Sequence, residues 1–223
     1  MDVSSYIMAP PRLTIILLLS GLFACGQNPP KHKADPAAVE FNKKALGLMA
    51  FVDNLDSSRK AVSLLDSATL IDSNFFAGYY NKLMFLNSLR QFDKAILAAN
   101  NAIRIRPFAH DLYLTRGIFY DQLGDTISST NDFQRSLAIC NTVLDTMDSK
   151  NTAFDYLLMN KATNLIMLGD QKEGNRFLKQ LYDKETDEGF KKFYGSLMNK
   201  PKKEFLALLN SSDQEDSVYP INK

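Results

Sequence analysis

Apolar side chains recur at steps of three and four residues over most of the chain, which is the period of an α-helix. Between residues 36 and 219, only Pro107 and Pro201 interrupt this pattern. Long helical stretches broken at a few points are typical of a protein built from helices packed against one another. The pattern therefore predicts an all-α protein.

The start of the first helix is marked by two residues. Asp35 is suited to cap a helix N-terminus, and Pro36 is suited to a first helical position because its missing N–H would be unsatisfied there anyway. We expect the first helix to begin near Ala37 and to continue to about Asp53.

The chain also carries an internal period of 34 residues. The residues that share it form three series: Leu55, Leu89 and Leu123; Ala61 and Ala95; Ala68 and Ala102. A period of this size indicates stacked helical hairpins in which each unit contacts mainly its neighbours.

One unit shows the features of a hairpin most clearly. Gly117 offers a small residue where two helices cross, with Tyr120 close by, and the turn is formed by Leu123, Gly124 and Asp125. Gly124 can end a helix in the left-handed conformation, and Asp125 can cap the next helix. This unit resembles a tetratricopeptide repeat, and the resemblance implies a solenoid of helical hairpins wound into a right-handed superhelix.

The same turn recurs at residues 168–170, which lie 45 residues after the first and so require a longer helix and loop around 140–152. In each unit a small residue occupies the same position of the second helix, where a larger side chain would push the helices apart. These residues are Ala61, Ala95, Ser129 and Gly174. We expect four units, at about 41–73, 76–107, 110–143 and 153–183.

The segment 187–210 follows the last unit. Its apolar residues Phe190, Phe193, Tyr194 and Leu197 share one helical face, and Pro201 can begin another short helix. We interpret this segment as capping helices that cover the end of the array, which completes a helical domain at 37–210. A docking helix for a partner is the alternative. Residues 211–223 are expected to be a loose tail.

The N-terminus has the layout of a signal peptide, with Arg12 before an apolar run at 13–23 and a small-residue junction. The run is too short for a lasting membrane span. The sequence Leu22-Phe23-Ala24-Cys25 resembles the lipobox of bacterial lipoproteins, which implies a signal peptide at 1–24 and lipidation of Cys25. An ordinary secreted protein cleaved nearby is the alternative, and translation can start at Met1 or Met8.

Residues 25–36 are rich in proline and polar side chains, so they predict an extended tether between the lipid and the helical domain. Gly26, rather than Asp, follows the lipidated cysteine, and by the same resemblance this favours the outer membrane. We therefore expect a lipid-anchored protein of the bacterial cell envelope, attached to the membrane through its anchor.

The amino-acid composition argues against several kinds of activity. The chain has 26 Lys plus Arg against 25 Asp plus Glu, so no basic field attracts nucleic acid. His32 and His110 are the only histidines, and Cys140 is the only cysteine besides Cys25. Because zinc sites need several such ligands at short spacing, we predict no metal and no cofactor. Cys140 lies in an apolar stretch and is expected to be a buried, inert thiol.

If the resemblance holds, a partner binds in the concave groove lined by the first helix of each hairpin. The predicted groove residues are Tyr80, Asn81, Met84, Asn87, Asp111, Leu114, Thr115, Ile118, Asp121, Gln122, Tyr156, Met159, Asn160 and Thr163. Some tetratricopeptide domains grip the C-terminal carboxylate of chaperones with a clamp of basic and asparagine side chains. Only Asn81 fits that clamp, while Asp111 and Thr115 stand where cations are needed, so we expect a different ligand.

Three classes of function follow from these features. The favoured one is a membrane-anchored interaction scaffold that binds an envelope protein or peptide in its groove. A narrower one is an accessory factor in the assembly of outer-membrane proteins, secretins or pili. An enzyme is the third and least favoured, because the chain has no Gly-rich phosphate loop, no paired metal ligands and no Gly-x-Ser-x-Gly motif.

Overall fold

A computed structural model describes residues 32–210, and within this part of the chain ten α-helices and one short 3₁₀ turn account for all regular structure. The helices are α2 (Pro36–Leu46), α3 (Leu55–Ile71), α4 (Phe76–Ser88), α5 (Phe92–Ile105), α6 (His110–Gln122), α7 (Thr126–Leu144), α8 (Phe154–Met167), α9 (Gln171–Lys184), α10 (Glu188–Leu197) and α11 (Lys202–Asn210). The prediction of an all-α protein is confirmed.

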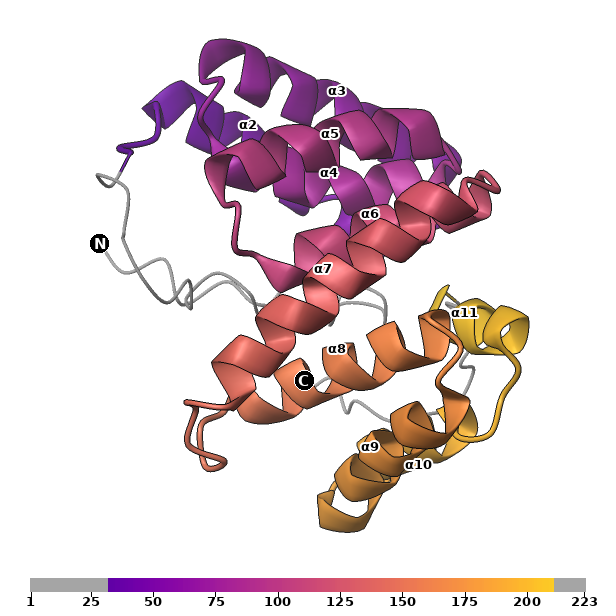
Figure 1. Cartoon of the computed structure of the whole chain (residues 1–223). Coiled ribbons are helices and arrows are strands. Elements are labelled where there is room, and N and C mark those ends of the chain that lie inside the picture. Colours follow the sequence, from indigo (N-terminus) through magenta and orange to yellow (C-terminus); the bar gives the residue numbers. More distant parts are fainter. Residues whose placement is uncertain (1–31, 211–223) are drawn as a thin grey trace.

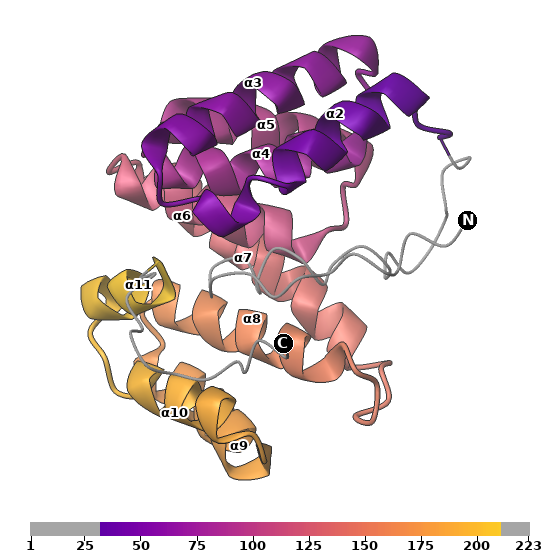
Figure 2. The ribbon, with the colours of Figure 1, turned by 180° about the vertical axis from the view of Figure 1, so that it is seen from behind.

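The helices pack in the order of the sequence, as antiparallel pairs. The pairs are α2 with α3, α4 with α5, α6 with α7 and α8 with α9, and each pair also packs against the next. Figures 1 and 2 show α2 to α5 gathered at one end of the molecule, α8 to α11 at the other, and α6 and α7 between them. This arrangement is a repeat-like helical array.

The two predicted turns have the expected geometry. Gly124 and Gly169 adopt positive φ angles of 79° and 93°, which the absence of a Cβ allows at little cost. Asp125 then accepts a hydrogen bond from the Ser128 N–H, and Asp170 accepts one from the Glu173 N–H. Each turn therefore ends one helix and caps the next, as the sequence indicated.

Small residues lie where paired helices cross. Ala61, Ala95, Ser129 and Gly174 are all buried. A Cβ at Gly117 would lie 2.7 Å from the ring of Phe133, and a Cβ at Gly174 would lie 2.5 Å from Ile166. Because these gaps are shorter than any normal contact between carbon atoms, the close packing of α6 on α7 and of α8 on α9 depends on glycine.

Two main apolar clusters form the core, and α6 contributes to both. One cluster joins α3, α4 and α5 with Leu112 and Phe119 of α6, and the other joins α7 to α11 with Leu114 and Ile118 of the same helix. The side chains of α6 that point to opposite sides of the helix thus connect the two ends of the array.

The first helix differs from the expectation. It ends at Leu46, and a 3₁₀ turn at Met49–Phe51 leads into α3, so the prediction of a helix to Asp53 was wrong. The helix stops at Gly47, where the low helix propensity of glycine removes the support needed for another turn. The N-terminal prediction is confirmed, because Asp35 accepts a hydrogen bond from the Ala37 N–H and Pro36 follows it.

Candidate interaction face

The predicted groove residues lie on α4, α6 and α8, the first helices of three successive pairs. Ten of the fourteen are buried: Tyr80, Met84, Asp111, Leu114, Thr115, Ile118, Tyr156, Met159, Asn160 and Thr163. Asn81, Asn87 and Asp121 are half-buried, and Gln122 is exposed. Gln122 is therefore the most exposed residue of this row, while the ten buried side chains shape and support the face.

A buried carboxylate stands at the junction of α4 and α6. Asp111 is fully buried, and its Oδ2 accepts a hydrogen bond of 2.9 Å from the Tyr80 hydroxyl. Burial lowers the pKa of Arg106, and the charges of Asp111 and Tyr80 act in the opposite direction. The Arg106 guanidinium also lies 3.8 Å from the centroid of the Phe76 ring. A cation and a phenol therefore face the Asp111 charge.

Next to Asp111, a histidine joins α6 to α8. The Nδ1 of His110 lies 3.3 Å from the Nδ2 of Asn160, and its ring centroid lies 5.7 Å from that of Tyr156. Burial lowers the pKa of His110, and this outweighs the opposite effect of Asp111. Because the imidazole is then neutral at pH 7, Nδ1 can accept from the amide. Burial, followed by the charge of Asp111, raises the pKa of Tyr156 well above its usual value.

A second polar contact joins α7 to α8. The Nδ2 of Asn164 donates to the Ser136 hydroxyl at 2.9 Å and to the Asn160 carbonyl at 2.8 Å. Cys140 is fully buried beside this contact, and burial raises the pKa of its thiol to about 12. At pH 7 the thiol is therefore protonated and a poor nucleophile, which supports the prediction that it is inert.

Sequence reasoning did not single out His110, Ser136 or Asn164 as part of this face. A signal was present, since Asn160 and Asn164 on α8 are four residues apart, as are Ser136 and Cys140 on α7. Residues at that spacing share one face of a helix. Recognising the contact also required knowing that these two faces meet.

Several buried acceptor oxygens on α6, α7 and α8 have no hydrogen-bond donor within residues 32–210. Asp111 Oδ1, Asn141 Oδ1, Asn160 Oδ1 and Asn164 Oδ1 are buried, and no donor among the described residues reaches them. A buried acceptor without a donor costs roughly 1–3 kcal/mol. These four oxygens are therefore a local cost to the packing of α6, α7 and α8, and their burial keeps them away from an approaching partner.

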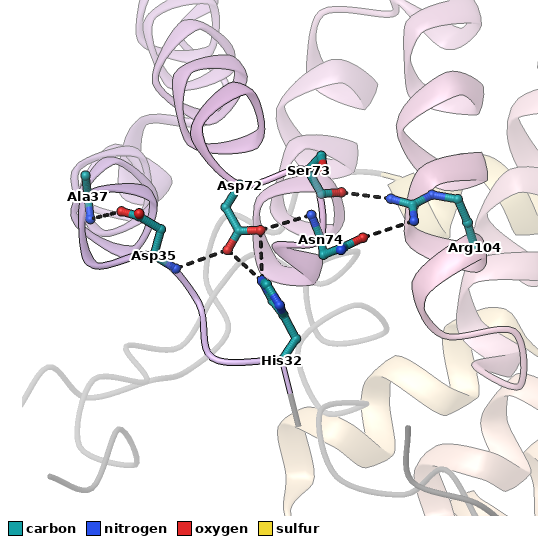
Figure 3. Close-up of polar contacts among 7 residues, drawn as sticks. All are labelled: His32, Asp35, Ala37, Asp72, Ser73, Asn74 and Arg104. Atoms are coloured by element: carbon teal, nitrogen blue, oxygen red, sulfur yellow. Dashed lines mark hydrogen bonds and ion pairs between the residues drawn. The ribbon is translucent and has the colours of Figure 1, made fainter. Parts of the chain in front are cut away.

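The chain enters the helical array through a polar clip, shown in Figure 3. The Nε2 of His32 lies 2.8 Å from both carboxylate oxygens of Asp72, which also accept from the N–H groups of Asp35 at 3.1 Å and Asn74 at 3.0 Å. Burial acts to raise the pKa of Asp72, but the hydrogen bonds from these partners outweigh it and the pKa is lowered. The predicted free tether at 25–36 is therefore bound to the array from His32 onward.

Arg104 holds the same loop from the other side. Its guanidinium donates to the Asn74 side chain at 3.0 Å and to the Ser73 carbonyl at 2.8 Å (Figure 3). The loop between α3 and α4 is thus fixed both to the entering chain and to α5.

A cavity of about 240 Å³ lies between α3, α4 and α5. Lys82 is buried there, and its ammonium donates to Asp66 at 2.6 Å and to Thr69 at 3.3 Å. Lys82 is therefore already paired, whereas Lys94, which also lines the cavity, is exposed.

Several predicted features lie outside the described residues: the signal peptide at 1–24, Cys25, Met1, Met8 and the tail at 211–223. Within residues 32–210, no group of three or more His, Cys, Asp and Glu side chains could hold a metal ion. In the same part of the chain no helix combines the length and the apolar character needed to cross a membrane.

No protein-family model matches the chain, and no curated protein matches it. The fold by itself places the chain among all-α proteins built as repeat-like arrays of helix pairs.

Proposed function

We propose that this chain is a lipid-anchored scaffold of the bacterial cell envelope that binds a protein or peptide along α4, α6 and α8. The observation that carries the proposal is the row formed by α4, α6 and α8, the first helices of successive pairs, with Asn81, Asn87 and Gln122 at least partly exposed on it. Such a row offers a long surface to an extended or helical segment. Its side chains are suited to binding rather than to catalysis.

We also infer that the array is of the tetratricopeptide type and follows a right-handed superhelix. The 34-residue period, the two glycine turns with positive φ and the small residues at the helix crossings support this inference. Stacked units of this kind create concave surfaces that bind peptides.

The anchor is tested by replacing Cys25 with Ser. Lipid attached at Cys25 would hold the chain stably at a membrane, since several acyl chains bind far more firmly than one. We expect wild-type chain in the outer-membrane fraction and the Cys25→Ser variant in the soluble fraction. A Cys140→Ser variant is the matched control and should stay with the membrane. Equal membrane association of all three chains would contradict the anchor.

The binding face is tested with Gln122→Arg, which places a bulky cation at the exposed end of α6. Gln134→Arg is the matched control, because Gln134 is also exposed but lies on α7, the second helix of the same pair. Cross-linking in intact cells should recover a stoichiometric partner with the wild type and the control, and at least several-fold less of it with Gln122→Arg. Loss with both variants, or with neither, would argue against this face.

A further inference from the structure

The last helix, α11, contacts α6, one of the three helices of the proposed binding row. The ammonium of Lys202, at the start of α11, lies 2.6 Å from Asp121 Oδ1 at the end of α6, across 81 residues of sequence, and 5.9 Å from the ring centroid of Phe133 on α7. Figures 1 and 2 both show α11 beside the C-terminal end of α8. The predicted capping helix therefore reaches the end of α6 through this ion pair and lies beside the end of α8.

The apolar face of α11 is buried in the same cluster as part of the predicted groove. Phe205, Leu206 and Leu209 are 0%, 5% and 1% exposed. Leu114 and Ile118 of α6 belong to that cluster, as do Tyr156 and Met159 of α8. α11 and these groove residues thus belong to one continuous apolar cluster, and Lys202 places the start of α11 at the C-terminal end of α6.

The connection before α11 is suited to release it. Asn199 adopts a positive φ of 59°, and Pro201 follows two residues later, so α10 and α11 are separated by a sharp turn. Contacts to α9 hold this turn: the Asn199 N–H donates to Asn175 Oδ1 at 2.8 Å, and Gln171 Nε2 donates to the Lys200 carbonyl at 2.5 Å. The turn can stay in place while the nine residues of α11, which are too few to form a stable helix alone, leave the site.

We propose that an amphipathic helix of a partner protein binds this site in place of α11. The contacts of α11 define the partner's sequence: a Lys or Arg, then a Phe three residues later, and Leu four and seven residues later. Lys202, Phe205, Leu206 and Leu209 have this spacing, which places one face of a helix in a groove. The proposal rests on the scaffold function above, since it specifies the chemistry of the partner.

The charge of Asp121 determines which amphipathic helices can bind at this site. Its side chain is 17% exposed, so an occupant that lacks a cation would leave a largely desolvated carboxylate without its ion pair. A helix with an acidic residue at that position would also be repelled. The site therefore selects helices with a basic first turn from the many amphipathic helices that could fill an apolar groove.

The test uses a fluorescein-labelled peptide with the sequence of residues 200–210 and the full chain. In the wild type the tethered α11 competes with the peptide at a high effective concentration. Lys202→Glu in the chain replaces the ion pair of α11 with repulsion from Asp121, removes the Lys202 contact with Phe133 and leaves the apolar face of α11 intact. By fluorescence anisotropy, the peptide should bind the Lys202→Glu chain at least tenfold more tightly than the wild type.

Exchanging the charges at position 121 of the chain and position 202 of the peptide tests whether these two residues pair directly. The Asp121→Lys chain should bind the original peptide at least tenfold more weakly than the Lys202→Glu chain does. A peptide that itself carries Lys202→Glu should bind the Asp121→Lys chain and not the Lys202→Glu chain. Only direct pairing between the peptide and position 121 gives this reversal.

Circular dichroism shows whether each variant is folded, and Lys202→Gln replaces Lys202→Glu if the latter is not. No peptide binding to a folded Lys202 variant, or binding that ignores Asp121→Lys, would show that α11 is a permanent part of the core and would overturn the proposal. The assay needs neither lipid nor an envelope partner, so its outcome is independent of the membrane and cross-linking experiments.

Discussion

At the scale of single residues, close contacts between helices are made by residues with little or no side chain. Gly117 and Gly174 lie against Phe133 and Ile166 with no space for a Cβ. The repeated small position of the second helices located Gly174, and the resemblance of one unit to a tetratricopeptide repeat located Gly117. It could not show which side chain fills the space opposite, since that depends on how the partner helix is rotated.

Gly174→Ala is expected to lower the free energy of unfolding by about 1–3 kcal/mol, because the added methyl meets Ile166 at 2.5 Å and the Ala162 carbonyl at 2.9 Å. Gly47→Ala is the control. Its φ of −62° suits alanine and the nearest atom would be 3.4 Å away, so we expect no loss and a gain of up to about 1 kcal/mol. Urea unfolding measures both, and equal stability of the two variants would refute the crossing as a constraint.

At the scale of elements, the polar clip around Asp72 fixes where the array begins. Asp72 follows α3, yet it binds His32 and Asp35, which are 40 and 37 residues earlier. Local sequence gives no sign of this contact, because a polar residue after a helix is usually solvated. The helix caps, by contrast, could be predicted, since Asp35, Asp125 and Asp170 act within two or three residues of themselves.

Asp72→Asn should destabilise the protein by about 1–3 kcal/mol at pH 7, because an amide cannot accept from all the donors that face this carboxylate. The folded state lowers the pKa of Asp72 below its usual 3.8. The charged form is therefore favoured by folding, and the stabilisation is present above about pH 3.8 and is lost as the pH falls through the lowered pKa.

The difference in unfolding free energy between wild type and Asp72→Asn should accordingly shrink as the pH falls below about 3.8. Chemical denaturation across this range measures it. Asp53→Asn, at an exposed loop position, is the control and should change stability by less than about 0.5 kcal/mol at every pH. A difference for Asp72→Asn that does not change with pH would exclude a role for its charge.

At the scale of the whole molecule, α6 joins two apolar clusters that are otherwise built from different helices. Leu65 of α3 is fully buried in one, and Leu178 of α9 is fully buried in the other. An array in which each unit contacts mainly its neighbours can open from either end, so its two halves need not unfold together.

Leu65→Ala and Leu178→Ala form a matched pair, and each should cost about 2–5 kcal/mol in the cluster that it belongs to. Native-state hydrogen exchange should speed up mainly in α2 to α5 for Leu65→Ala and mainly in α8 to α11 for Leu178→Ala. Faster exchange over the whole chain with either variant would mean that α6 couples the clusters into a single cooperative unit.

The sequence by itself determined the helical class, the turns at Gly124 and Gly169, the caps and the small residues at crossings, because all of these follow from interactions within a few residues or from a repeated period. Only the tertiary structure decided that Asp72 binds the entering chain and that Lys202 of α11 pairs with Asp121 of α6. It also decided which polar residues of α6, α7 and α8 meet. Contacts between distant segments depend on how rigid helices are placed in space, and no local pattern encodes that placement.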